Sequence, residues 1–307
     1  MKKLIIFCLI LLNISHVYAT SKTVLVFGGS KGWIGQKLVA LLKEQGHNPI
    51  CASSRLENRE DIIAEIKKTK PDLIVNAAGI IGNPTVDWCE THKAETIRTN
   101  VIGTLNLADI AFEHNLHVTN ISTGCIYEYD ESHPMKSGIG FTEEETPNFD
   151  GSFYSRSKIM MERLILEYPN VLNLRVKMPI SMDMERGFVA KIVKYKKLIN
   201  VPNSLCILED MLPIAVDMTL RELKGNYNFV NPGAISHHEV LELYKKYVDP
   251  THTYESFSVE EQDKILKARR ANAELSMEKL LKLYPNIPHI KDALPKLLEK
   301  IKISITK

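Results

Sequence analysis

Short apolar runs alternate with longer stretches of helical periodicity along most of the chain. Residues 24–27 have the pattern of a buried strand, and the stretch 33–45 places Ile34, Leu38 and Leu41 on one helical face. Repeated strand-then-helix order favours parallel pairing through right-handed crossovers. The sequence therefore predicts the α/β class with a doubly wound parallel sheet. Further strands are expected at 73–75, 117–121, 171–176 and 227–230, with helices at 61–70, 94–114 and 154–167.

Beyond Pro179 the alternation weakens into helices separated by turns that contain Pro and Gly. We expect a sheet domain over residues 20–176 and a smaller C-terminal substrate-binding lobe over residues 177–307, with interleaving of the two left open. Helical periodicity returns over 277–303, with breaks expected at Pro285, Pro288 and Pro295.

The beginning of the chain has the layout of a secretory signal peptide. Lys2 and Lys3 precede the apolar run 4–12, and Ala19 ends a small-residue cleavage pattern. The run is short for a membrane span, which takes about 20 apolar residues. Residues 1–19 are thus predicted to be a signal peptide or N-terminal anchor, which implies the secretory pathway. A buried first strand or an interfacial segment is the structural alternative.

Composition and charge narrow the class of protein further. With 44% hydrophobic and 25% charged residues the chain has the composition of a folded globular protein. Its 39 Lys and Arg nearly balance 37 Asp and Glu, and no run of five like charges occurs, so we expect no nucleic acid partner. The five cysteines form no CxxC pair and have no histidine at zinc-ligand spacing, so we expect neither a disulfide framework nor a metal site.

The first expected strand runs directly into a glycine-rich turn that opens the first expected helix. Gly29, Gly32 and Gly35 have GxxGxxG spacing, and Trp33 and Ile34 lie between the last two. Glycine permits close approach of the backbone to a pyrophosphate, whose charge the helix N-terminus stabilises. The strand-turn-helix setting predicts a dinucleotide site, so we expect residues 20–176 to be a Rossmann domain.

The residues after the second strand indicate which dinucleotide binds. Ser54 and Arg55 stand there, and no carboxylate occurs until Glu57. A guanidinium and hydroxyls suit the 2′-phosphate of NADP, which a carboxylate would repel. The sequence therefore favours NADP(H), with an exposed loop arginine as the alternative.

A tyrosine and a lysine are placed four residues apart on the helix expected at 154–167. Tyr154 and Lys158 share one helical face. A nearby cation stabilises a phenolate, so Tyr154 is a candidate acid/base group for a carbonyl oxygen during hydride transfer. Polar or small residues also end the third and fourth strands, namely Asn76, Ala77, Ala78, Ser122 and Thr123.

These motifs together resemble the extended short-chain dehydrogenase/reductase superfamily. The resemblance implies that Thr123 holds the substrate carbonyl, Tyr154 acts as acid/base, and Lys158 supports Tyr154 and holds the nicotinamide ribose. It also implies that Asn76, Ala77 and Ala78 adjoin the cofactor.

A narrower set of motifs resembles the bifunctional nucleotide-rhamnose synthases, a family similar to dTDP-4-dehydrorhamnose reductase. The likeness runs from about Thr23 to the C-terminus and leaves out residues 1–19. It implies a cytoplasmic, NADPH-dependent 3,5-epimerase/4-reductase that converts an NDP-4-keto-6-deoxyglucose, UDP- or dTDP-linked, to NDP-L-rhamnose. The segments that carry it are 32–35, 54–59, 86–90, 124–130, 177–181 and 231–233.

The same resemblance assigns the remaining site residues. Cys125 matches the epimerase cysteine, and a thiol near a cation ionises readily enough to exchange protons; a small buried hydrophobe is the alternative role. Lys191 matches the second acid/base group, with a solvated basic helix face as its alternative. The substrate-binding residues implied are Met178, Ser181, Asn203, Arg270 and Asn272.

Two other functions stay open at the level of sequence. One is a ketoreductase without epimerase activity, and the other is a non-catalytic NADP-binding regulatory subunit, since a fold does not fix a function. The expected partners are a nucleotide sugar and a second copy of the chain in a homodimer. A membrane would be contacted only through residues 1–19.

Overall fold

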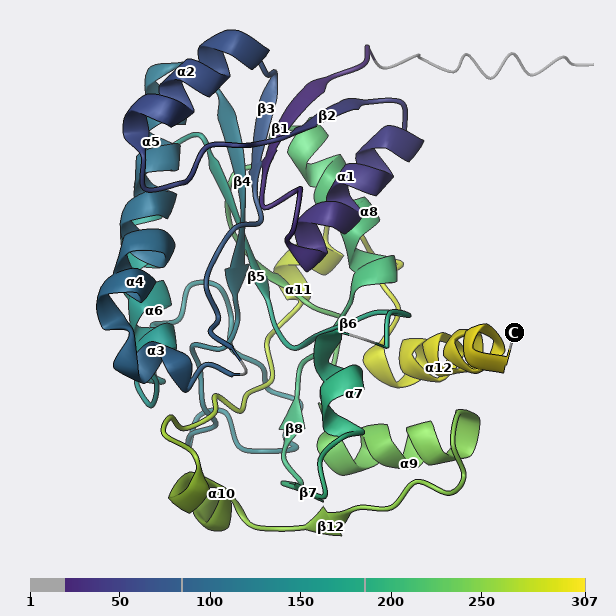
Figure 1. Cartoon of the computed structure of the whole chain (residues 1–307). Coiled ribbons are helices and arrows are strands. Elements are labelled where there is room, and N and C mark those ends of the chain that lie inside the picture. Colours follow the sequence, from purple (N-terminus) through teal and green to yellow (C-terminus); the bar gives the residue numbers. More distant parts are fainter. Residues whose placement is uncertain (1–19, 84, 185, 307) are drawn as a thin grey trace, which may run out of the picture.

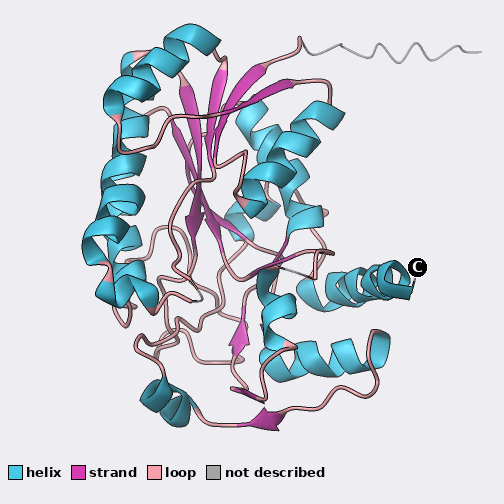
Figure 2. Ribbon diagram, in the orientation of Figure 1, coloured by secondary structure: helices cyan, strands magenta, loops and turns pink. Residues whose placement is uncertain are grey.

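A parallel β-sheet forms the centre of the protein (Figures 1 and 2). The computed structural model describes residues 20–83, 85–184 and 186–306. Within them the main sheet has six strands in the order β10-β5-β4-β3-β1-β2, all parallel. Strand order reverses between β1 and β3, and doubly wound sheets bind ligands at the carboxyl edge beside such a reversal. The strands are β1 (Thr23–Phe27), β2 (Asn48–Cys51), β3 (Leu73–Asn76), β4 (His117–Thr123), β5 (Val171–Val176) and β10 (Gly225–Phe229).

Helices cover both faces of this sheet, which confirms the doubly wound class. Val24 and Val26 of β1 pack against the α1 side, whereas Leu25 and Phe27 pack against the α2 and α5 side. A strand buried on both faces needs a continuous apolar run, as residues 24–27 supply. One layer holds α1 (Trp33–Glu44), α8 (Leu208–Leu220) and α11 (Glu278–Leu281). The other holds α2 (Arg59–Thr69), α3 (Trp88–Thr91), α4 (Lys93–Ile97), the π-helix η1 (Arg98–Gly103), α5 (Thr104–Glu113) and α6 (Phe153–Ile165).

A second hydrophobic cluster lies beyond the carboxyl edge of the sheet, around α7, α9 and α12. Because α8 and β10 return to the main sheet, the chain after residue 176 contributes to both parts of the structure. The remaining elements are α7 (Gly187–Ile192), α9 (His237–Tyr247), α10 (Val259–Ile265), α12 (Ile290–Thr306) and the strand pairs β6 (Pro179–Ile180) with β9 (Cys206–Ile207), β8 (Pro202–Asn203) with β11 (Ile235–Ser236), and β7 (Lys197–Leu198) with β12 (Glu255–Ser256).

Buried asparagines form a hydrogen-bonded row across the middle of the sheet. Asn76 donates to Asn120 at 2.9 Å, and Asn120 donates to Asn173 at 2.7 Å. These residues are direct register partners on β3, β4 and β5. Asn173 donates onward to Glu162 of α6, which also pairs with the buried Arg175. Each buried amide is therefore satisfied, and the row ties the sheet to α6.

Two expected helices differ in detail from the structure. The stretch expected as one helix over 94–114 contains the π-helix Arg98–Gly103, which periodicity cannot detect because the chain stays helical on either side. Pro295 does not break its helix, because α12 runs through it and loses only one backbone donor.

The predicted signal peptide or anchor, residues 1–19, lies outside the described residues. Among the helices that are described, none is both long and apolar enough to cross a membrane.

Candidate active site

The glycine-rich turn after β1 forms a cradle that only glycine can build. A Cβ at Gly32 or Gly35 would lie 2.6 or 2.3 Å from the carbonyl oxygen of Gly28. Gly28 itself has a φ of +79°, a left-handed conformation that favours glycine. The N-terminus of α1 carries no side-chain cap and no acidic residue in its first turn. Its free N–H groups and positive dipole end suit a pyrophosphate, so the turn fits the expected dinucleotide.

Trp33, the first residue of α1, contacts Asp183 and Gly187, just before and at the start of α7. Its indole donates a hydrogen bond to Asp183 at 3.0 Å. Gly187, at the start of α7, has a φ of +89° and packs so closely that a Cβ there would lie 2.7 Å from the Trp33 ring. Trp33 therefore joins the dinucleotide turn to Asp183 and Gly187. Ile34 is half-buried and packs against the core on the α1 side.

The residues after β2 are arranged around a carboxylate that the sequence did not reveal. Ser54 donates both its amide and its hydroxyl to Glu65 of α2. Burial by itself would raise the pKa of Glu65. The hydrogen bonds from Ser53 and Ser54 outweigh burial, so the pKa of Glu65 is lowered. Arg55 is exposed and pairs with Glu57 at 2.8 Å. Such surface pairs are weak, so the Arg55 guanidinium is free to exchange Glu57 for a phosphate.

The turn after β3 is held by a residue that the sequence analysis missed. Asn100, in the π-helix, accepts from the amide of Ile80 at 2.8 Å and donates to its carbonyl at 2.7 Å. The wider π turn brings this buried side chain beside Gly79, where a Cβ would lie 3.3 Å from its oxygen and 3.8 Å from the Nζ of Lys158. A π-helix within an α-helix often marks a functional site, but it leaves no simple sequence pattern.

Of the three residues expected beside the cofactor at the end of β3, one has its side chain turned inward. Asn76 is buried, donating to Asn120 and accepting from the amide of Ala78. Its side chain therefore supports the turn from within. The backbone of Ala77 and Ala78 forms the turn itself, and a Cβ on Gly28 would meet the Ala77 carbonyl at 2.8 Å.

Thr123, Cys125 and Tyr154 come together where β4 ends and α6 begins. Thr123 accepts a hydrogen bond from the amide of Cys125 at 3.1 Å. The carbonyl of Cys125 accepts from Ser155 of α6 at 2.7 Å. Burial raises the pKa of Tyr154 well above its ordinary value, Cys125 raises it further, and a hydrogen bond with Thr123 offsets this only in part.

This direction differs from the expected one. No stabilising effect of Lys158 on the Tyr154 phenolate outweighs burial, so Tyr154 keeps its proton at neutral pH. A protonated phenol is the form that can donate a proton to a carbonyl oxygen. Lys158 is 5% exposed, and burial lowers its pKa to about 8 although Glu162 raises it.

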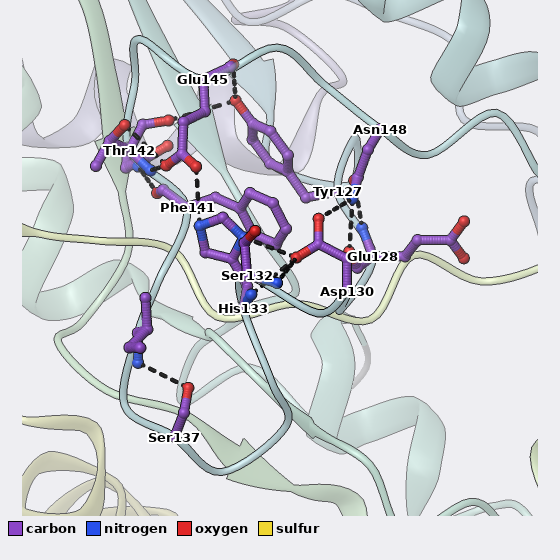
Figure 3. Close-up of polar contacts among 12 residues, drawn as sticks. Tyr127, Glu128, Asp130, Ser132, His133, Ser137, Phe141, Thr142, Glu145 and Asn148 are labelled. Carbon is purple, nitrogen blue, oxygen red and sulfur yellow. Dashed lines mark hydrogen bonds and ion pairs between the residues drawn. The ribbon is translucent and has the colours of Figure 1, made fainter.

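The segment between β4 and α6 is pinned around a buried histidine (Figure 3). His133 lies between two carboxylates, with Nδ1 3.0 Å from Asp130 and Nε2 2.8 Å from Glu145. Its ring stacks on Phe141 at 3.7 Å, and Phe141 stacks in turn on Tyr127. The network holds together the chain between Tyr127 and Glu145, a stretch that begins two residues after Cys125.

Two of the expected substrate-binding residues contact each other. Asn203 donates to the side chain of Asn272 at 2.9 Å and accepts from the amide of Ala273 at 3.1 Å. Arg270 is held by Asp87 in a two-point ion pair at 3.0 and 3.1 Å. Its Nε is not used in that pair, so the guanidinium can still donate to a substrate.

The other expected residues lie on the lobe side. Ser181 donates to Glu209 at the start of α8. Met178 packs against the second cluster with a strained φ of +43°. Lys191 is exposed near the end of α7, and its side chain makes no hydrogen bond or ion pair with the described residues. No group of three metal-ligating side chains occurs in the described part of the chain.

The fold and these residues define a Rossmann-type enzyme with a dinucleotide turn and a Tyr/Lys pair. A sequence-family profile described as the NAD dependent epimerase/dehydratase family matches residues 24–182. The chain is 52% identical, over 270 residues, to the bifunctional dTDP-4-dehydrorhamnose 3,5-epimerase/dTDP-4-dehydrorhamnose reductase of Arabidopsis thaliana, covering 87% of this chain and 90% of that protein. The chain is also 49% identical to a trifunctional UDP-glucose 4,6-dehydratase/UDP-4-keto-6-deoxy-D-glucose 3,5-epimerase/UDP-4-keto-L-rhamnose-reductase of the same plant. That match covers 87% of this chain and 40% of that longer protein.

Solved structures agree with these similarities. The L780 UDP-rhamnose synthase from Acanthamoeba polyphaga mimivirus superposes with a TM-score of 0.87 at 37% identity, covering 91% of this chain and 99% of that one. A dTDP-4-dehydrorhamnose reductase from Bacillus anthracis in complex with NADP has a TM-score of 0.77 at 18% identity, over 93% of this chain and 99% of that one, a similarity of fold alone. The chain belongs to the NAD dependent epimerase/dehydratase family, and its resemblance to the nucleotide-rhamnose synthases is confirmed.

Proposed function

We propose that the protein is an NADPH-dependent 3,5-epimerase/4-reductase that converts an NDP-4-keto-6-deoxy-D-glucose, UDP- or dTDP-linked, to NDP-L-rhamnose. The observation that carries the proposal is 52% identity to a bifunctional epimerase/reductase over 90% of that protein. Supporting it, Thr123, Cys125 and Tyr154 are assembled at the end of β4 beside a turn shaped for a dinucleotide.

Epimerisation requires proton removal at C3 and C5, next to the C4 ketone. The Cys125 thiolate would take each proton from carbon, and the electron pair would move onto the C4 oxygen as an enolate. A second group must return a proton to the opposite face, and Lys191 is our candidate. Lys191 is exposed on α7 and its side chain has no hydrogen-bond or ion-pair partner among the described residues, so its ammonium is available to a substrate.

Reduction follows at C4. The hydride would come from NADPH once it is bound. Tyr154 would donate its proton to the C4 oxygen, and Thr123 would orient that oxygen. Lys158, whose ammonium lies near Gly79, would hold the nicotinamide ribose. Asn203, Asn272 and Arg270 are the proposed contacts to the nucleotide sugar, with Met178 and Ser181 on the lobe side of the pocket.

The two half-reactions can be measured separately. UDP-4-keto-6-deoxyglucose in D2O without NADPH should exchange its C3 and C5 protons, as seen by proton NMR, and added NADPH should then give UDP-rhamnose. The Cys125→Ala variant should lose proton exchange yet still reduce the pre-epimerised ketone. The control variant Cys51→Ala, at an exposed cysteine, should keep both proton exchange and reduction. The Tyr154→Phe variant should still catalyse exchange of the C3 and C5 protons but should not reduce the C4 ketone.

Other results would point to the rival functions. NADPH oxidation with C3 and C5 unchanged would reduce the assignment to a ketoreductase. Binding of NADPH without oxidation across a panel of sugar nucleotides would indicate a regulatory subunit.

The proposed location is the cytoplasm, where NADPH and sugar nucleotides are available. Mass spectrometry of the N-terminus of the protein from its own cells tests this, because cleavage after Ala19 would place the protein in the secretory pathway.

The proposed assembly is a homodimer. The packed helices α4, η1 and α6 expose Ile97, Ile102, Met160 and Leu164, an apolar face suited to a second copy. Light scattering should give a dimer that Met160→Glu converts to a monomer; a monomeric wild-type protein would overturn the assignment.

A further inference from the structure

Trp33 belongs to two parts of the structure at once. Its backbone lies in the dinucleotide turn, as the first residue of α1, and its ring packs against the hydrophobic core on the α1 side. The same ring reaches the chain that follows β6, where the indole N–H donates to Asp183 at 3.0 Å. A single residue therefore extends from the expected pyrophosphate site to the chain that leads into α7.

The backbone amide of Trp33 is open to a ligand. The first hydrogen bond of α1 runs from the amide of Gln36 to the carbonyl of Gly32 at 2.9 Å. The amides of Trp33 and the two residues after it precede this bond and have no acceptor among the described residues. Such amides are the donors that a helix N-terminus offers to a pyrophosphate. A bound dinucleotide would thus hold the backbone of the same residue whose ring contacts Asp183.

A second contact of the indole determines where α7 begins. Gly187 is the first residue of α7 and has a φ of +89°. A Cβ on Gly187 would lie 2.7 Å from the Trp33 ring and 3.1 Å from the carbonyl oxygen of Pro179. The backbone of Gly187 is therefore packed between the indole and β6. Because protein interiors are close-packed, a change in the position of the indole must be accompanied by a change at the start of α7.

The residues before and after these contacts are the ones expected to meet the substrate. Met178 and Ser181 precede Asp183 in the chain, and Lys191 lies about one turn beyond Gly187 on α7. Trp33 thus contacts the chain at two points that lie between residues of the proposed substrate pocket.

We propose that Trp33 is a positioning residue that couples binding of the dinucleotide to binding of the nucleotide sugar. A pyrophosphate at the turn fixes the backbone of Trp33, and the indole then holds Asp183 and Gly187, so that α7 keeps one position beside the substrate. A ligand that orders a segment lowers the entropic cost of ordering it for a second ligand. The effect on the nucleotide sugar rests on the proposed function, whereas the effect on α7 does not.

Hydrogen–deuterium exchange of the full-length protein tests the effect on α7. The probe is 2′-phospho-ADP-ribose, which has the pyrophosphate and the 2′-phosphate of NADP but no nicotinamide that could touch the sugar. At saturation it should slow amide exchange in the α7 peptide of the wild-type protein roughly threefold or more. Trp33→Phe, which keeps an aromatic ring but has no indole N–H, should lose most of this response. Unchanged α7 exchange in the wild-type protein would overturn the proposal, and that result needs no variant to fold.

Three further variants separate the indole hydrogen bond from general destabilisation. Asp183→Ala removes the acceptor and should lose the α7 response as Trp33→Phe does. Asp183→Asn keeps a side-chain oxygen that can accept from the indole, so it should retain most of the response. Tyr284→Phe removes an aromatic donor to a different aspartate, Asp217 of α8, and should behave like the wild-type protein. An equal loss of response in all of these variants would contradict the role of Trp33.

Calorimetric titration of UDP-rhamnose measures the coupling itself. Saturating 2′-phospho-ADP-ribose should lower the Kd of UDP-rhamnose about fivefold to tenfold in the wild-type protein, and UDP-rhamnose should lower the Kd of the probe by the same factor. In Trp33→Phe the factor should fall below about twofold. Equal Kd values with and without the probe in the wild-type protein would contradict the proposal. If neither UDP-rhamnose nor dTDP-rhamnose binds, the proposed function fails, and α7 exchange still decides the role of Trp33.

Discussion

Asp87 and Arg270, far apart in the sequence, form a two-point ion pair with N–O distances of 3.0 and 3.1 Å. Burial works to raise the pKa of Asp87, but the Arg270 hydrogen bonds and charge lower it. Arg270→Gln should cost about 1.5–3 kcal/mol in the free energy of unfolding, the range for hydrogen bonds to charged groups. It should also raise the KM for the nucleotide sugar about tenfold with little change in kcat, because the lost contact binds ground and transition states alike.

The matched variant is Asp87→Asn, which removes the same ion pair but keeps the guanidinium. Urea unfolding should show a similar loss of stability, and steady-state kinetics should show a KM close to that of the wild type. If both variants raise KM equally, Arg270 only braces the fold and its assignment to the substrate is wrong.

Lys158 should make the stability of the protein depend on pH in an unusual direction. Its pKa in the folded protein is about 8, below the ordinary 10.5. Below pH 8 the lysine is charged in both states, and the full cost of burying the ammonium is present. Between pH 8 and 10.5 the unfolded chain still binds the proton that the folded protein has released, so this contribution to stability improves as pH rises.

Lys158→Met removes that cost. The variant should be inactive in reduction yet more stable than the wild type by up to about 3 kcal/mol at pH 7, with the difference disappearing by about pH 10.5. Denaturant unfolding at several pH values measures this, with Lys191→Met on an exposed position as the control. A variant that is less stable at every pH would show that Lys158 is paired more favourably than its burial implies.

Much of this architecture follows from sequence patterns that act locally. The apolar run 24–27 and the turn after it specify a buried strand and a dinucleotide cradle, because their conformations depend on neighbours only a few residues away. The placement of Tyr154 and Lys158 on one helical face could equally be predicted, because residues four apart lie about one helical turn from each other. The residues that escaped detection act across the fold. Asn100 depends on a π turn, and Glu65 depends on the packing of α2 against the end of β2.

Gly187 is a sensitive point of contact between the dinucleotide turn and the lobe. Alanine there meets both an unfavourable φ of +89° and the Trp33 ring. Gly187→Ala should lower the free energy of unfolding by about 2–4 kcal/mol, combining a left-handed backbone with overpacking. Because Trp33 begins α1 directly after Gly32, the same change should raise the KM for NADPH.

Gly225→Ala is a close control, since its φ is +92° and nothing lies within 4 Å of the added Cβ. It should cost only about 1–2 kcal/mol and leave the KM for NADPH unchanged. Equal effects of the two substitutions would mean that the Trp33 contact has no part in cofactor binding.

Arg55 is the residue on which the choice of coenzyme should depend. Its weak surface pair with Glu57 leaves the guanidinium available to a 2′-phosphate, while Glu65 occupies the hydroxyl and amide of Ser54 and places a negative charge nearby. Arg55 therefore has to offset that charge as well as bind the phosphate. Arg55→Ala should raise the KM for NADPH roughly tenfold to hundredfold, equivalent to about 1.5–3 kcal/mol, and leave the KM for NADH unchanged.

The control variant is Arg59→Ala, at an α2 arginine paired with Asp109 and Glu113. It should change the KM for neither coenzyme. Equal weakening of NADPH and NADH by Arg55→Ala would show that this side chain contacts a part common to both coenzymes, and the 2′-phosphate would then have to be bound elsewhere.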